Sequence, residues 1–257
     1  LLEQLNSRDC TDHPAWLLRA AVRATAEGRH AEALRMLESV PETHRAGARE
    51  RRLHGQLRLW TGDATSAVRL LQPVVDADPG DAAARDALVD AVRALGDASA
   101  AWRVAGPLLD APDTSEGRLE TLAELALEAD QPAAVSGILR RVSSTDDRQG
   151  RRAGLEGRAL LALGQPAAAA DRLGSVPVEA LTTPAALALV DSTFEVRGVN
   201  AALEAARRVA TRPDGRDLVA RRLMLELLAS DATAAASSRT ELAAFDAAAP
   251  RFADAEV

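Results

Sequence analysis

Four histidines and one cysteine carry the most reactive side chains of this sequence, and all five lie between positions 10 and 54. Cys10 and His13 are three residues apart, and a thiolate with an imidazole is a ligand pair for a soft metal such as zinc. His30 and His44 do not extend this pair with the i, i+4 spacing that helical metal sites use. We therefore expect no metal site, and we expect the histidines to be solvated at the surface.

The residues that common catalytic motifs require are missing. All 31 basic residues are arginine, and the sequence has no tyrosine. Without lysine there is no Walker-type phosphate loop, no Schiff-base lysine and no Ser-x-x-Lys nucleophile pair. Gly-x-Ser-x-Gly, His-Glu-x-x-His and calcium-loop patterns are absent as well. We predict that the protein is not an enzyme, and that it has no catalytic residue and no cofactor.

Charged residues are the remaining candidates for a functional surface. Glu120, Glu124 and Glu128 follow one another at i, i+4 and i+8, so a helix places them on one face, where like charges repel by roughly a few tenths of a kcal/mol per pair. Such a face either stays solvated or binds a basic ligand, and the sequence leaves both interpretations open. The net charge of -7 argues against a nucleic-acid partner, because phosphate-binding surfaces carry excess positive charge.

A repeated helical element must position these residues. Glycine occupies five of seven positions that are spaced 34 residues apart along the sequence. We call these positions the anchors; they are Gly28, Gly62, Gly96, Asp130, Gly164, Gly198 and Ala232. Small residues recur mainly seven positions before and five positions after the anchors, and leucine recurs mainly nine positions after them. Small side chains at fixed points let two amphipathic helices approach closely, and leucine fills the remaining gap. The unit is therefore a helical hairpin, and the predicted fold class is all-α.

This repeat resembles the tetratricopeptide repeat (TPR) family, whose unit is a helix-turn-helix of 34 residues. The clearest copy consists of Gly55, Trp60, Gly62, Ala67, Leu71 and Pro79. The resemblance implies a right-handed superhelical solenoid of about seven repeats. In the sixth repeat Asp191 and Arg207 occupy apolar positions, so we expect a one-residue slip that uses Ala202 and Ala206 instead. The three tryptophans, Trp16, Trp60 and Trp102, are expected to be buried; for Trp60, near the end of the first helix of its repeat, a position facing the groove is the alternative.

The same spacing gives the predicted domain limits. The solenoid covers residues 14–250, with repeats near 14–47, 48–81, 82–115, 116–149, 150–183, 184–217 and 218–250. Residues 1–13 are interpreted as a linker or the tail of a preceding repeat, and residues 251–257 as the start of a following segment. We therefore expect the sequence to be part of a longer array. Residues 143–150 form the most polar connection, where we expect a mobile joint.

The resemblance also implies where a partner binds, because the concave surface of such superhelices is lined by the first helix of each repeat. The candidate groove residues at these positions are Arg49, Arg52, Gln56, Asp86, Asp90, Arg93, Glu120, Glu124, Glu128, Arg151 and Arg158, followed by Ser192, Glu195, Arg222 and Glu226. Chaperone-binding members of the family grip a terminal carboxylate with lysine and asparagine. No asparagine occupies the corresponding positions here, so we expect no binding of a chaperone tail.

The predicted function is a non-catalytic protein–protein interaction scaffold that is part of a larger bacterial protein. In style, a lysine-free, alanine- and arginine-rich array resembles the repeat regions that recruit enzymes to exopolysaccharide export or secretion complexes. The alternative is a ligand- or peptide-sensing regulatory domain of a signalling or transcription protein. The chain is expected in the periplasm under the export interpretation and in the cytoplasm otherwise. No apolar run is long enough to cross a bilayer.

Overall fold

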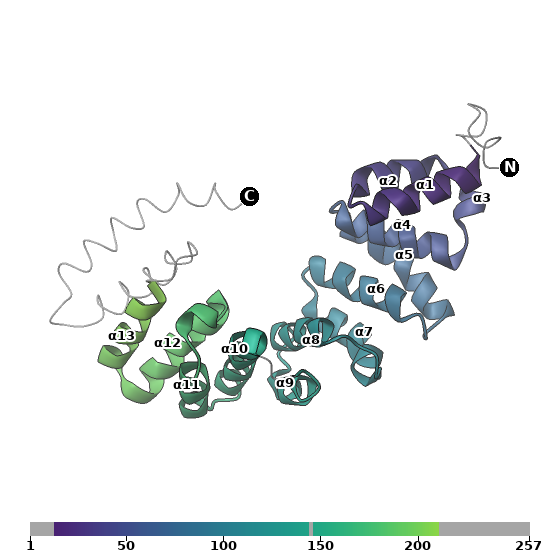
Figure 1. Cartoon of the computed structure of the whole chain (residues 1–257). Helices are drawn as coiled ribbons and strands as arrows, with labels where there is room; N and C mark the ends of the chain where they lie inside the picture. Colours follow the sequence, from purple (N-terminus) through teal and green to yellow (C-terminus); the bar gives the residue numbers. More distant parts are fainter. Residues whose placement is uncertain (1–12, 144–145, 211–257) are drawn as a thin grey trace. The chain divides into compact units, whose positions relative to one another are not determined.

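A computed structural model describes residues 13–143 and 146–210 of the chain (Figure 1). Within these ranges the regular secondary structure is helical and contains no strand, as predicted. No helix of the described residues is long and apolar enough to span a membrane. The chain divides into two compact units between Thr114 and Ser115, called unit 1 and unit 2 below.

Unit 1 consists of three helical hairpins. Its helices are α1 (Pro14–Ala26), α2 (His30–Ser39), the short α3 (Glu42–Arg45), α4 (Ala48–Trp60), α5 (Ala64–Ala77), α6 (Ala82–Ala94) and α7 (Ala98–Asp110). The hairpins pair α1 with α2, α4 with α5 and α6 with α7. Each hairpin packs on the next, because α2 contacts α4, α5 contacts α6, and α4 contacts α6.

Unit 2 repeats this arrangement. Its helices are α8 (Glu116–Glu128), α9 (Pro132–Leu139), α10 (Asp146–Ala162), α11 (Pro166–Gly174), the 3-10 turn η3 (Val178–Ala180), α12 (Thr183–Arg197) and α13 (Val199–Ala210). The pairs are α8 with α9, α10 with α11 and α12 with α13, and α8, α10 and α12 contact one another in order. We call the first helix of each hairpin an A helix and the second a B helix. The predicted seventh repeat lies outside the described residues.

The glycine anchors mark the turn between the A and B helices. The five described anchor glycines have φ angles of 71° to 89°, in the left-handed region that glycine enters without steric cost. The fourth anchor, Asp130, has a φ of 56° and is the described non-glycine residue with a positive φ. In unit 1 an aspartate follows two of the anchors and caps the B helix, as where the Asp63 carboxylate accepts a hydrogen bond of 3.0 Å from the Ser66 amide. The chain thus reverses at the anchor glycine, and the next residue, the aspartate, caps the start of the B helix.

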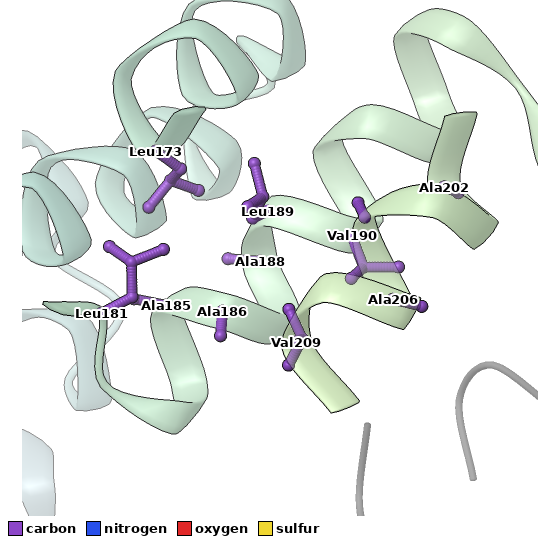
Figure 2. Packing of buried hydrophobic residues seen from close by; sticks show 11 residues of the cluster. Leu173, Leu181, Ala185, Ala186, Ala188, Leu189, Val190, Ala202, Ala206 and Val209 are labelled. Carbon is purple, nitrogen blue, oxygen red and sulfur yellow. The ribbon is translucent and has the colours of Figure 1, made fainter. Parts of the chain in front are cut away.

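Close approach of the two helices in a hairpin explains the small residues of the repeat. A Cβ atom added to Gly55 would lie 2.5 Å from Cγ of Leu71, and one added to Gly157 would lie 2.3 Å from Cγ of Leu173. Both leucines are fully buried. Figure 2 shows how Leu173 and Leu181 lie against Leu189 and the alanines of α12 in unit 2. The core is therefore built from small and medium side chains at short helix–helix distances.

The sixth repeat confirms one expectation, and the polar connection contradicts another. Ala202 and Ala206 are fully buried, as the one-residue slip predicts, whereas the side chain of Arg207 lies outside the described residues. Of the predicted joint at residues 143–150, residues 144–145 lie outside the described residues and the chain is helical from Asp146 onward, so the connection is shorter than predicted. Gly150 lies in this helix and packs closely on Ala180: an added Cβ would lie 2.2 Å from the Ala180 carbonyl oxygen. Polarity of the sequence did not reveal this contact.

Candidate binding surfaces on the A helices

All eleven candidate groove residues lie on A helices, and they fall into separate clusters. In unit 1, α4 carries Arg49, Arg52 and Gln56, and α6 carries Asp86, Asp90 and Arg93. In unit 2, α8 carries Glu120, Glu124 and Glu128, and α10 carries Arg151 and Arg158. Ser192 and Glu195 lie on α12, with Ser192 buried, whereas Arg222 and Glu226 lie outside the described residues. Whether any of them binds a partner stays a prediction.

A pocket of about 440 Å³ lies between α1 and α4, and we call it the α1/α4 pocket. It is lined by Leu18, Arg19, Val22, Arg49, Glu50, Arg52, Leu53 and Gln56. The candidates on α4 are thus brought together, with α1 as the opposite wall. Sequence reasoning missed Leu18, Arg19 and Leu53, although the repeat spacing places both apolar residues on helix faces that turn toward a neighbouring helix.

The three arginines of the α1/α4 pocket have different surroundings. Nη1 of Arg52 donates to both carboxylate oxygens of Asp81 at 2.8 Å, and Asp81 in turn caps α6 at the amide of Ala84. Arg52 therefore ties one hairpin to the next. Arg19 and Arg49 are exposed, and neither forms a hydrogen bond or ion pair with another described residue. Their charge is available to a ligand.

The three candidates on α6 do not line this pocket. Asp86, Asp90 and Arg93 are partly buried, and each has polar or charged partners within the chain. Their role in holding neighbouring side chains is therefore as well supported as a role in binding.

In unit 2 the expected acidic face is already neutralised in part. Arg151 on α10 contacts Glu120 at 3.3 Å and Glu124 at 3.2 Å. The Glu120 side chain is only 6% exposed, so of the two interpretations left open for the glutamate face, the solvated one does not hold for this residue. The glutamates and Arg151 are predicted groove residues of successive repeats, and the packing of α10 on α8 joins them. Glu128 is exposed and also has partners within the chain.

Arg158 lines a second pocket, of about 330 Å³, between α8, α10 and α12. We call it the α8/α10/α12 pocket; its lining residues are Leu127, Arg158, Leu161, Ala162, Pro184, Leu187, Ala188 and Asp191. Burial lowers the pKa of the Arg158 guanidinium, whereas the nearby Glu124 and Glu128 raise it. Partial burial raises the pKa of the Asp191 carboxyl, and Glu195, one turn further on, raises it again. Arg158 is therefore partly removed from water, whereas Asp191 is exposed.

The histidines and tryptophans differ from expectation. Trp60 is 49% and Trp16 37% exposed, so the prediction of burial is wrong for Trp16, and of the two possibilities for Trp60 burial does not hold. The Trp60 ring stacks on His30 with 4.6 Å between centroids, outside the α1/α4 pocket. His54 is largely covered rather than solvated: it lies 3.6 Å from Glu38 and beside Arg58. Burial lowers its pKa, as do Arg45 and Arg58. Among the described residues no group of three or more histidine, cysteine or acidic side chains is arranged to hold a metal.

Comparison with known proteins identifies the fold. No protein-family model matches the sequence, and no curated protein matches it. A TPR protein from Parabacteroides merdae ATCC 43184 is similar in structure, with a TM-score of 0.66 and 12% identity over 90% of this chain and 93% of that one. Two further TPR structures align less well. TTC0263 from Thermus thermophilus has a TM-score of 0.31 and 20% identity over 84% and 98% of the two chains. The TPR domain of P58(IPK) has a TM-score of 0.35 and 14% identity over 88% and 69%. With the hairpins and their anchored turns, the first of these likenesses shows that this chain has the all-α solenoid fold of TPR proteins.

Proposed function

We propose that the protein is a non-catalytic interaction scaffold that binds an acidic segment of a partner protein in the α1/α4 pocket. The supporting observation is the pair Arg19 and Arg49, two exposed guanidinium groups on facing helices of one pocket, neither engaged by another described residue. Guanidinium groups pair with carboxylates through two parallel hydrogen bonds, which orients a ligand as well as attracting it.

Apolar residues give the same pocket a second means of recognition. Leu18 and Leu53 are partly buried, and Val22 is among the exposed large apolar residues of the chain. A partner segment that alternates acidic and apolar side chains can therefore satisfy the arginines and cover this apolar area at once. Glu50 is the acidic member of the lining, and it disfavours a ligand whose negative charge is spread evenly.

The test is capture of partner proteins by the full chain, compared with a charge-reversed and a matched control variant. Arg19→Glu with Arg49→Glu should lose partners that the wild-type chain retains, and the retained complexes should dissociate as salt is raised. Arg69→Glu with Arg103→Glu makes the same change of net charge on the B helices α5 and α7 and should keep those partners. Identical partner sets for all three proteins, with helical circular dichroism intact, would contradict the proposal.

Within this function, we propose that the partners belong to an exopolysaccharide export or secretion complex and that the chain works in the periplasm. The support is the composition of the repeat, which has 31 arginines and no lysine, together with the absence of common catalytic motifs. Export or synthesis enzymes should be among the partners that the Arg19 and Arg49 reversal removes. Kinases or transcription factors in their place would favour a regulatory role.

A further inference from the structure

The α8/α10/α12 pocket combines an apolar floor with two opposite charges. Three consecutive A helices line it, with Leu127 from α8, Leu161 from α10 and Leu187 from α12 supplying much of the apolar surface. Arg158 on α10 and Asp191 on α12 are its charged lining residues. It belongs wholly to unit 2 and shares no residue with the α1/α4 pocket, so the two surfaces can be tested independently.

Arg158 lacks a hydrogen-bond acceptor among residues 13–143 and 146–210. Glu124, at the equivalent position of the preceding A helix, accepts instead from Arg151, at 3.2 Å. Glu124 and Glu128 act on Arg158 through their fields, without a hydrogen bond or ion pair to it. A half-buried guanidinium has five N–H donors to satisfy, and a carboxylate matches two of them with the correct geometry.

Asp191 is the complementary case. It forms no ion pair with another described residue, and Glu195 adds a second negative charge one turn further along α12. Asp191 is exposed, and its carboxylate and that of Glu195 repel each other in the unliganded protein. A ligand cation at this end of the pocket relieves this repulsion, and a ligand carboxylate at the other end pairs with the partly buried Arg158.

We propose that the α8/α10/α12 pocket binds an internal segment of a partner protein in which an acidic and a basic residue flank an apolar one. The acidic residue pairs with Arg158, the apolar side chain covers Leu127, Leu161 and Leu187, and the basic residue pairs with Asp191 and Glu195. A protein segment fits better than a small molecule, because the pocket is shallow and open, whereas small ligands are mostly enclosed in their sites. The order of charges on the segment is fixed by the order of α10 and α12.

A peptide array tests this proposal with the full 257-residue chain as probe. The array carries acetylated and amidated octapeptides that place glutamate, leucine and arginine in every order within alanine. The wild-type chain should select peptides with leucine between the two charges, in one preferred order. Arg158→Gln should weaken these signals by about 10-fold, the loss typical of one charge-assisted pair. Arg140→Gln, on the exposed cap of α9, is the matched control and should change nothing.

Exchange of the charges, Arg158→Asp with Asp191→Arg, gives the decisive result. It should invert the preferred order of glutamate and arginine in the selected peptides, which a merely structural role of either residue does not predict. Unchanged selection by Arg158→Gln, or a wild-type chain that shows no preference for leucine between the two charges, would overturn the proposal. If Arg158→Gln changes selection while the Arg19 and Arg49 reversal changes no partner, this site stands and the α1/α4 proposal fails. The opposite pattern refutes this site alone.

Discussion

Volume exchange within a hairpin offers a direct test of the packing that defines the fold. In the second hairpin Gly55 on α4 faces the fully buried Leu71 on α5, and in the third the same two repeat positions hold Val89 and Ala105, both buried. The larger side chain therefore lies on the B helix in the second hairpin and on the A helix in the third. The two side chains of each pair contain the same total number of carbon atoms. The double variant Gly55→Val with Leu71→Ala should give the second hairpin the arrangement of large and small side chains that the third hairpin has.

The magnitudes follow from the geometry. A Cβ at Gly55 would approach Cγ of Leu71 to 2.5 Å and Cδ2 to 2.9 Å, so Gly55→Val alone overpacks the hairpin and should cost about 1–3 kcal/mol. Valine has a better helix propensity than glycine, and this offsets up to about 0.5 kcal/mol of the overpacking cost. Leu71→Ala alone leaves a cavity and should cost about 2–5 kcal/mol. Because each change relieves the other, the double variant should be more stable than the sum predicts by about 1–3 kcal/mol.

Urea unfolding of the four proteins, followed by far-ultraviolet circular dichroism, gives this coupling energy. The control cycle combines Gly55→Val with Leu108→Ala on α7, a helix that packs against α6, and should be additive within about 0.5 kcal/mol. Additivity in the Gly55 and Leu71 cycle as well would refute the reasoning. The small and large residues would then not be a packing pair, and the repeat positions would have to be explained by propensity alone.

Two further changes test the turns and the covered histidine. Asp130→Gly should raise the free energy of unfolding by about 0.5–1 kcal/mol, because glycine adopts the positive φ of 56° without strain. Asp130→Asn removes the charge but keeps the size of the side chain, so its free energy of unfolding should stay within about 0.5 kcal/mol of wild type. A higher thermal stability of the asparagine variant than of the glycine variant would contradict the prediction. For His54, burial and the neighbouring Arg45 and Arg58 lower the pKa in the folded state, so the unfolded chain takes up a proton that the folded chain refuses. Stability should therefore fall as the pH drops below the unfolded pKa of about 6.5, and less so in His54→Asn, when urea midpoints of both proteins are compared at pH values from about 7 to 5.

The fold could be predicted from the sequence because its signals are carried by the main chain. A glycine every 34 residues marks a turn with positive φ, and small residues at fixed offsets mark the closest approach of two helices. The turn with positive φ and the close approach of the two helices both arise within one hairpin, so the residues that allow them recur at fixed positions of the repeat. The exposure of Trp16 and Trp60 could not be predicted in this way. It depends on which neighbouring hairpin covers a side chain, and a hairpin-level pattern does not record this.

The binding surfaces were predicted only in part, because position on a helix does not determine which charges meet across helices. The sequence placed Arg49, Arg52 and Arg158 on A helices, but it did not distinguish Arg52, held by Asp81, from Arg49, which has no described partner. Glu120 was expected on a face that is either solvated or binds a basic ligand, and it is buried against Arg151. Side-chain pairing of this kind is decided by the offset between neighbouring helices.

That offset nevertheless leaves a trace in sequence separations. Equivalent positions on adjacent A helices are 34 residues apart, and a stagger of one or two helical turns reduces this to about 27–30. The hydrogen bonds from Arg52 to Asp81 and from Arg151 to Glu124 span 29 and 27 residues. On the following A helix, the residues in this window from Arg158 are Ala185, Ala186, Leu187 and Ala188, none of which is acidic. The lack of an ion pair between Arg158 and α12 agrees with this spacing. Glu128, 30 residues before Arg158, also falls within it and acts on Arg158 without an ion pair, so the spacing permits a pair but does not ensure it.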